Sequence, residues 1–198
     1  MISSKIGHRL DSPLSKIIKF VFKTKNLNPT YFTLLGLLVN ILAAIAFVDG
    51  KWLWAGILIL TAGLFDMLDG AVARTFCKVS NFGGFLDSVI DRYSDLVLLI
   101  GLIIYYAQHN NMHLLVLTAV VSIGTILIPY TRARAEVFIP HCDVGIMERA
   151  ERIILLALGG LLQNVFHAMP IVLWILAAFT HLTVFHRIYY TWKESKNM

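Results

Sequence analysis

Long apolar runs separated by short polar connections are the main pattern along the chain. Six runs, at residues 31–48, 52–76, 82–107, 113–138, 146–165 and 169–190, approach or exceed the roughly 20 residues that a helix needs to cross a hydrocarbon core. The connections between them are too short to hold a separate soluble domain. The pattern predicts an all-α integral membrane protein, a single domain over residues 1–198 whose six transmembrane helices form one bundle at 31–192.

Residues 12–24 have a different, amphipathic pattern. Ser12 followed by Pro13 is typical of a helix start. Apolar residues then recur at positions 14, 17, 18, 21 and 22, while the lysines at 16, 19 and 23 fall on the opposite face. We expect a juxtamembrane helix that lies on the anionic inner surface of the membrane. A helix that simply packs on the cytoplasmic face of the bundle is the compatible alternative.

Composition and charge support a membrane protein. Hydrophobic residues make up 58% of the chain and charged residues 15%, whereas soluble domains average about 45 to 50% and about 25%. This apolar content excludes a disordered chain, and no nucleic acid is expected as a partner despite the net charge of +5. With both termini cytoplasmic, 16 of the 17 Lys and Arg lie inside and Lys51 lies outside. The positive-inside rule therefore predicts a multi-pass protein of the cytoplasmic membrane with both termini inside.

Five aspartates interrupt the second and third apolar runs. They are Asp66, Asp69, Asp87, Asp91 and Asp95. If they faced lipid, their cost would be on the order of 12 to 17 kcal/mol, at about 2.5 to 3.5 kcal/mol each. They must therefore line an enclosed polar cavity, bind cations or be protonated.

The spacing of the first four aspartates brings them together. Asp66 and Asp69 are three residues apart and Asp87 and Asp91 are four apart, so each pair shares one helix face. The short loop between the two helices predicts antiparallel neighbours whose acidic faces oppose each other near the cytoplasmic boundary. Four hard oxygen donors would repel one another without divalent cations such as Mg²⁺, Mn²⁺ or Ca²⁺. A cation or proton pathway in a transporter is the alternative interpretation of intramembrane acids.

Small residues and an arginine accompany the acids. Gly70, Ala73 and Gly83 lie near them in the sequence and would allow close approach to the backbone. Arg74, at the membrane boundary, offers a planar fork of donors for phosphate. Together these features favour a site for a diphosphate.

The combined pattern D-x2-D-G-x2-A-R-x8-G-x3-D-x3-D resembles the signature of the CDP-alcohol phosphotransferases, membrane enzymes of phospholipid head-group synthesis. All eight fixed residues are present, from Asp66 to Asp91. The resemblance implies a six-span fold and a transfer of a phosphatidyl-type group from a CDP-linked lipid to an alcohol, with release of CMP. It also implies that Asp66, Asp69 and Asp87 bind two divalent metal ions, Mg²⁺ or Mn²⁺, with Asp91 completing the site and acting as the general base.

The resemblance further implies a nucleotide site and a homodimer. Its nucleotide-binding residues would be Thr33, Asp69, Gly70, Ala73, Arg74, Gly83 and Asp87. Thr33 is included because the segment 28–33, Asn-Pro-Thr-Tyr-Phe-Thr, is similar to a family segment near the nucleotide. Asp95, one further turn along, is expected to be a buried hydrogen-bonding group rather than a metal ligand.

Arginines at the cytoplasmic ends of the last three apolar runs indicate a phosphorylated acceptor. They are Arg132, Arg134, Arg149, Arg152 and Arg187. A small uncharged alcohol would not require so many donors, whereas a phosphate takes bidentate pairs. Simple ion pairs are the alternative, because Arg132 with Glu136 and Glu148 with Arg152 have the helical i, i+4 spacing.

The segments 130–136 and 145–152 resemble the branch of the family that makes phosphatidylinositol phosphate or its archaeol-based counterpart. The resemblance implies inositol phosphate as acceptor, CDP-diacylglycerol or CDP-archaeol as donor, and the five arginines as contacts of the acceptor phosphate. Arg132 stands where some members have lysine. Glycerol phosphate, serine or inositol as acceptor, with the same chemistry, and a cation or proton transporter are the alternative functions.

Overall fold

The computed structural model describes residues 29–76 and 80–196, and this part of the chain is built from six α-helices. The helices are α2 (Thr30–Val48), α3 (Trp52–Thr75), α4 (Asn81–Gln108), α5 (Met112–Ala135), α6 (Arg149–Phe166) and α7 (Ala168–Ser195). The predicted all-α class is confirmed. The predicted helix at 12–24 lies outside the described residues.

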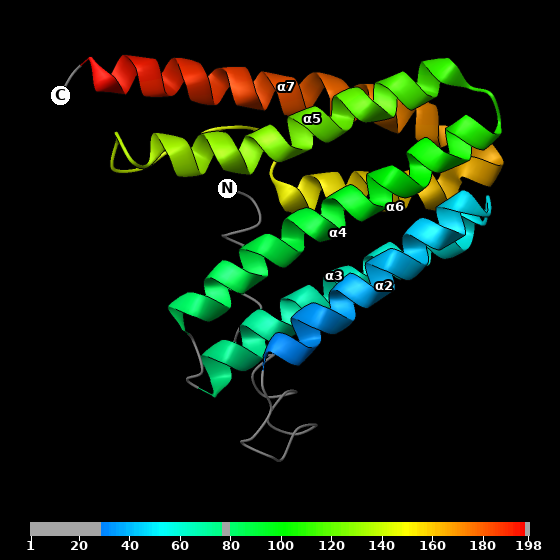
Figure 1. Ribbon diagram of the computed structural model, residues 1–198, viewed down its shortest axis with the longest axis horizontal. Helices are drawn as coiled ribbons and strands as arrows, with labels where there is room; N and C mark the ends of the chain where they lie inside the picture. Colours follow the sequence, from blue (N-terminus) through cyan, green and yellow to red (C-terminus); the bar gives the residue numbers. More distant parts are fainter. Residues whose placement is uncertain (1–28, 77–79, 197–198) are drawn as a thin grey trace.

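The chain runs back and forth between the two ends of an elongated bundle (Figure 1). The turns after α2, α4 and α6 lie at the right-hand end of the view, and the connections after α3 and α5 lie toward the opposite end. The start of α2 and the end of α7 are therefore on the same side of the bundle. This is the arrangement expected of an even number of membrane crossings.

Turn residues with positive φ and side-chain caps mark the ends of several helices. Gly50, with φ +69°, and His167, with φ +49°, turn the chain between α2 and α3 and between α6 and α7. Ser80 caps α4 because its Oγ accepts the N–H of Gly83 at 3.0 Å. Asn111 caps α5 in the same way, through the N–H of Leu114 at 3.2 Å. Each connection satisfies main-chain groups that the helix itself leaves open.

The connection between α5 and α6 is longer than the sequence predicts. Helix α5 ends at Ala135 rather than 138, and α6 begins at Arg149 rather than 146. Two residues of α7 hold the intervening backbone out of helical form: Thr183 Oγ1 accepts the N–H of Met147 at 3.1 Å, and Arg187 Nε donates to the carbonyl of Val144 at 2.8 Å. These contacts span about 40 residues of sequence, so local periodicity could not predict them.

Close helix contacts depend on small residues. Gly101 of α4 lies against the backbone of Ala44 in α2, and Gly160 of α6 lies against Gly56 in α3. Such small-residue interfaces bring the backbones of membrane helices together. Helix α2 packs against both α3 and α4, and α3 also packs against α6. The acidic faces of α3 and α4 oppose each other as the sequence predicts, since oxygens of Asp66, Asp69 and Asp87 lie within 4.8 Å of one another, while α2 packs closely against both helices.

Substituting Gly101 with Ala is expected to destabilise the protein by about 1 to 3 kcal/mol, because the new Cβ would lie 2.6 Å from the Ala44 carbonyl oxygen. The matched control is Gly63→Ala on α3, where nothing lies within 4 Å of the added Cβ. Thermal unfolding in detergent should show a lower midpoint for Gly101→Ala and no loss for Gly63→Ala. Equal midpoints would contradict the proposed close packing of α2 and α4.

Four of the six helices are long and apolar enough to cross a membrane by length and composition: α2, α3, α5 and α7. Helices α4 and α6 are more polar. Helix α4 carries Asp87, Asp91 and Asp95, and α6 begins with Arg149 and Arg152. These charges explain why the composition of α4 and α6 alone does not mark them as spans, although other helices also carry charged residues, such as Asp66 and Asp69 on α3. The fold is that of a multi-pass membrane protein.

Candidate active site

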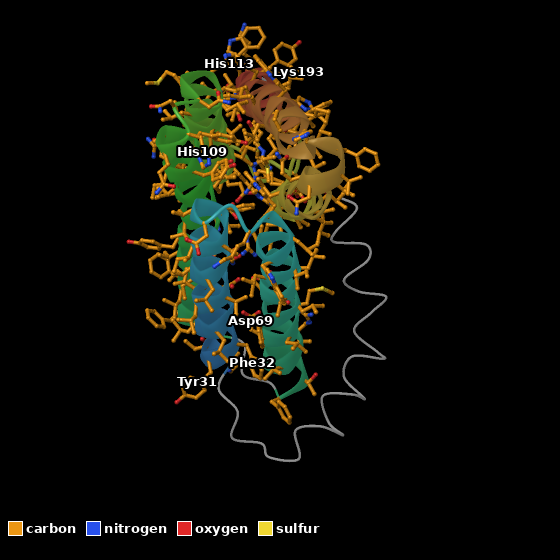
Figure 2. All side chains as sticks on the ribbon, turned by 90° about the vertical axis from the view of Figure 1, so that its right-hand side faces the viewer. Tyr31, Phe32, Asp69, His109, His113 and Lys193 are labelled. Carbon is orange, nitrogen blue, oxygen red and sulfur yellow. The ribbon has the colours of Figure 1, made fainter. Side chains whose placement is uncertain are left out.

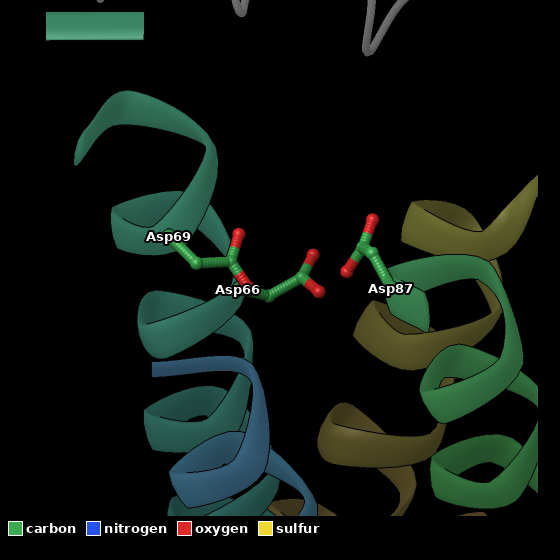
Figure 3. A group of neighbouring side chains, drawn as sticks. All are labelled: Asp66, Asp69 and Asp87. Carbon is green, nitrogen blue, oxygen red and sulfur yellow. The ribbon is translucent and has the colours of Figure 1, made fainter. Parts of the chain in front are cut away.

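Three aspartates from two helices form a compact acidic cluster (Figure 3). Asp66 and Asp69 project from α3, Asp87 projects from α4, and their carboxylates point toward one another. One oxygen from each lies within 4.8 Å of the others. The helical spacing predicted from the sequence places Asp66 and Asp69 on one face of α3, and Asp87 of α4 points toward them (Figure 3).

The cluster fits a hard divalent cation. Asp69 is buried at 7% exposure, and Asp87 Oδ1 is buried without a hydrogen-bond donor among the described residues. A buried carboxylate oxygen without a donor is costly unless a cation or water satisfies it. The donor set consists only of carboxylate oxygens, which Mg²⁺ and Mn²⁺ prefer over softer metals.

Helix α2 contributes to this cluster through Thr33. Its hydroxyl donates to Asp69 Oδ2 at 2.7 Å, and both side chains are buried. In Figure 2, Asp69 and Phe32 lie in the layer formed by α2 and α3, away from His113 and Lys193 on α5 and α7. The hydrogen bond helps to fix the orientation of the Asp69 carboxylate within the cluster. Thr33, predicted near the nucleotide, thus lies directly beside the acids.

Asp91 lies on α4 next to the cluster but is held by an arginine. Arg149, the first residue of α6, places Nη1 3.0 Å from Asp91 Oδ1 and 2.8 Å from Asp66 Oδ1. Arg92 makes a longer contact of 3.5 Å with Asp91 Oδ2. The three-carboxylate cluster therefore contains Asp66, Asp69 and Asp87, while Asp91 stands at its edge.

Asp95 pairs with the second arginine of α6. Arg152 Nη2 donates to Asp95 Oδ2 at 2.7 Å, and both residues are buried. Asp95 is thus buried and hydrogen-bonded, as expected, and that it does not bind the metal stays a prediction. This ion pair joins α4 to the N-terminus of α6 and so helps to position Arg149 one turn earlier.

A polar cavity of about 10 Å³, room for about one water molecule, adjoins Asp91 and Asp66. Asn40 of α2 and Ser94 of α4 line it and are themselves buried. The sequence analysis did not include either residue in the site. Asn40 could have been predicted from the sequence as a residue of the polar site, because an amide in the middle of an apolar 19-residue helix requires a polar environment.

The other predicted nucleotide residues lie around the C-terminal end of α3 and the N-terminal end of α4. Arg74 is exposed, and its guanidinium lies over Gly70, where an added Cβ would be 3.2 Å from Nη1. Ala73 precedes Arg74 on α3. Gly83 lies in the first turn of α4 and gives its N–H to the Ser80 cap. Glycine at position 70 thus makes room for the arginine fork.

The remaining predicted arginines already have protein partners. Arg132 donates to Glu136 at 3.0 Å and also to Asp143. Arg187 is 2% exposed and donates to the carbonyls of Val144 and Ile128, the latter at 2.5 Å.

The surroundings of the predicted arginines differ. Arg134 is exposed and lies over the Phe138 ring, 5.2 Å from its centroid. Arg187 is close enough to Arg132 and Arg152 to interact electrostatically. The Nε atoms of Arg149 and Arg152 are buried without an acceptor among the described residues. Arg187 is thus near Arg132 and Arg152, and two of the arginines, Arg149 and Arg152, keep an Nε–H that makes no hydrogen bond among the described residues.

Comparison with known proteins agrees with this geometry. The chain is 37% identical to archaetidylinositol phosphate synthase of Methanothermobacter thermautotrophicus over 169 residues, which cover 84% of each chain. The crystal structure of Mycobacterium tuberculosis phosphatidylinositol phosphate synthase with CDP-DAG bound is similar with a TM-score of 0.81 at 30% identity, covering 93% of this chain and 94% of that one. The structure of the same enzyme in complex with manganese and citrate also matches with a TM-score of 0.81 at 30% identity, covering 92% of this chain and 88% of that one.

The match to a family extends over most of the chain. Residues 26–184 match the family described as CDP-alcohol phosphatidyltransferase. This range includes the acidic cluster, Thr33 and four of the five arginines. An enzyme family is thereby favoured over the alternative of a cation or proton transporter. The chain belongs to the CDP-alcohol phosphatidyltransferase family.

Proposed function

We propose that the protein transfers a phosphatidyl-type group from a CDP-linked lipid to a hydroxyl of inositol phosphate and releases CMP. The observation that carries this proposal is the approach of Asp66, Asp69 and Asp87 to within 4.8 Å. These residues belong to the sequence pattern that resembles the family signature. The donor is CDP-diacylglycerol or CDP-archaeol.

Asp66, Asp69 and Asp87 would hold two divalent metal ions, with Asp91 completing the site. Bound Mg²⁺ or Mn²⁺ would supply Lewis-acid neutralisation of the diphosphate charge. Thr33 orients Asp69 through its 2.7 Å hydrogen bond. Asp87 Oδ1, which is buried and has no hydrogen-bond donor among the described residues, supports the metal site without reference to similar proteins.

Asp91 is proposed as the general base. Its carboxylate accepts the proton of the acceptor hydroxyl while the hydroxyl oxygen attacks the lipid-side phosphorus. The bond between that phosphorus and the oxygen bridging to the cytidylyl phosphate breaks, and CMP leaves with the bond's electron pair. The position of Asp91 at the edge of the three-carboxylate cluster supports this role, because a base must reach the acceptor rather than be enclosed by ligands.

The nucleotide would be held at the cytoplasmic ends of α3 and α4. Gly70, Ala73 and Gly83 are small residues that would let a ligand approach the backbone, and Arg74 would offer a fork of donors to phosphate. Asp69, Asp87 and Thr33 complete the group. The exposure of Arg74 and its placement over Gly70 support this assignment.

Inositol phosphate is the proposed acceptor for two reasons. Similar proteins are named archaetidylinositol phosphate synthase and phosphatidylinositol phosphate synthase. At the start of α6, Arg149 and Arg152 have buried Nε donors that make no hydrogen bond within the described part of the chain, and the helix dipole there also favours an anion. Arg132, Arg134 and Arg187 would complete the acceptor-phosphate site.

We further propose that all six helices span the cytoplasmic membrane with both termini inside, and that the protein forms a homodimer. The distribution of Lys and Arg supports the orientation. The CDP-lipid would enter from the inner leaflet and the water-soluble acceptor from the cytosol. The homodimer rests on family resemblance alone.

CMP release with a panel of acceptors tests the proposed function. Purified protein with CDP-diacylglycerol or CDP-archaeol and Mn²⁺ should release CMP with inositol phosphate and at least about tenfold less with glycerol phosphate, serine or inositol. The expected preference arises because a site with unpaired buried donors disfavours a ligand that lacks the phosphate. Equal rates with unphosphorylated inositol would reject the acceptor assignment, and absence of CMP with every acceptor would reject the transferase function.

A further inference from the structure

Arg149 links three elements through one guanidinium. It comes from the first turn of α6, and its Nη1 lies between Asp66 of α3 and Asp91 of α4, at 2.8 and 3.0 Å. Its Nε is 3.6 Å from Asp95 Oδ1. The exposed fractions of the Arg149 and Asp91 side chains are 22% and 16%, so water screens these charges only partly. The cation is thus surrounded by three carboxylates.

Asp66 has two competing partners in this arrangement. It belongs to the three-carboxylate cluster that fits a metal, and its Oδ1 also receives the shorter ion pair from Arg149. A guanidinium and a divalent cation repel each other, so both cannot share Asp66 at this distance without loss of binding energy. A buried acidic cluster also requires a positive charge to be stable.

We propose that Arg149 is an internal counter-cation, which neutralises Asp66 and Asp91 in the metal-free protein and competes with a divalent metal for Asp66. This inference rests on the proposed function of the acidic cluster as a metal site. Metal binding then frees the Arg149 guanidinium, which lies at the α6 N-terminus where the acceptor phosphate is proposed to bind. Arg149 would thereby couple metal occupancy to acceptor binding, because each ligand favours the same released state of the side chain.

The test measures Mn²⁺ binding and metal-free stability of the purified full chain, without lipid or acceptor. Electron paramagnetic resonance of free Mn²⁺ should show that Arg149→Gln binds Mn²⁺ about tenfold more tightly than the wild type, because one charge-assisted competitor is removed. In EDTA, the thermal unfolding midpoint of Arg149→Gln should be lower than that of the wild type. Addition of Mn²⁺ should raise the midpoint of Arg149→Gln by more than it raises the midpoint of the wild type. The two effects have opposite signs, which simple damage to the fold would not produce.

Arg92→Gln is the matched control. It removes the same charge beside Asp91, but Arg92 is 40% exposed, lies 3.5 Å from Asp91 and donates to the carbonyl of Ser88. Mn²⁺ affinity should change by less than about twofold, as for an exposed ion pair. If Mn²⁺ affinity rises equally in Arg92→Gln and Arg149→Gln, the cause is the loss of a positive charge near the site rather than the specific position of Arg149, and the proposal is overturned.

The outcomes separate this inference from the proposed function. Mn²⁺ affinity that is unchanged or weaker in Arg149→Gln overturns the counter-cation role, while binding by the wild type preserves the metal site. A wild type that binds no Mn²⁺ rejects the metal site itself. If Arg149→Gln cannot be purified, Arg149→Lys is the variant to measure. Its single ammonium cannot reproduce the planar fork of the guanidinium, so we expect it to bind Mn²⁺ more tightly than the wild type does. Equal Mn²⁺ affinity in the two proteins would overturn the proposal.

Discussion

Replacing Asp91 with Asn is expected to lower kcat for CMP release by at least about 100-fold, the lower end of what a positioned general base contributes. Asn has nearly the same shape as Asp but cannot accept a proton from the acceptor hydroxyl. Asp91 lies outside the three-carboxylate cluster, so binding of CMP in the presence of Mn²⁺ should change by less than about tenfold. Steady-state CMP release and calorimetric titration with CMP measure the two quantities.

Asp49→Asn is the matched control for this prediction. Asp49 follows α2 at the opposite end of the bundle, where it forms an exposed ion pair with Lys51 at 2.9 Å. The same substitution there should leave kcat and CMP binding unchanged. An Asp91→Asn protein with wild-type kcat would remove the base assignment, and one that has lost CMP binding would show that the main role of Asp91 is to complete the metal site.

Removing the divalent metal is expected to lower activity by at least about 10³-fold, because metal stabilisation of phosphoryl charge supplies several kcal/mol. EDTA treatment followed by addition of Mn²⁺ or Mg²⁺ should abolish and then restore CMP release. Restoration shows that the protein did not simply unfold. Activity that survives exhaustive chelation would reject metal-assisted transfer.

The Asp87→Asn variant locates this requirement in the cluster. One oxygen of Asp87 is buried and receives no hydrogen bond from the residues that the structure describes, so replacing the carboxylate removes a proposed ligand and leaves a buried amide in its place. Mn²⁺ affinity should fall by more than about tenfold. Residues that only hydrogen-bond to metal ligands commonly change metal affinity by about tenfold when they are mutated, and loss of a ligand should cost at least as much. Wild-type Mn²⁺ affinity in this variant would place the metal elsewhere.

The helices and the acidic residues of the site could be predicted from the sequence. Six apolar runs give six helices because membrane-length hydrophobic segments have few alternatives to helical structure. Asp66 and Asp69 lie on one face because the helical period fixes their relation. Arg132 with Glu136 also forms the ion pair that their spacing predicts, at 3.0 Å. Each of these features depends on residues within a few positions of one another.

Contacts between distant segments could not be predicted in the same way. The hydrogen bond from Thr33 to Asp69, the ion pair of Arg149 with Asp66 and the bond from Arg187 to the Val144 carbonyl join residues 36, 83 and 43 positions apart. The sequence placed Arg149 and Arg187 near a phosphate because arginines collect at cytoplasmic helix ends. It carried no information on which carboxylate or carbonyl each guanidinium would meet.

The sequence by itself determined the all-α membrane architecture, the family pattern and the helix faces that carry the acids, because hydrophobic length and helical period are local properties. Only the tertiary structure decided that α2 packs against both acidic helices, that Asp91 stands beside the cluster, and that Arg149 reaches across to Asp66. The physical reason is that buried charges are satisfied by whichever opposite charge packing brings within about 3 to 4 Å, and packing depends on contacts along the whole chain.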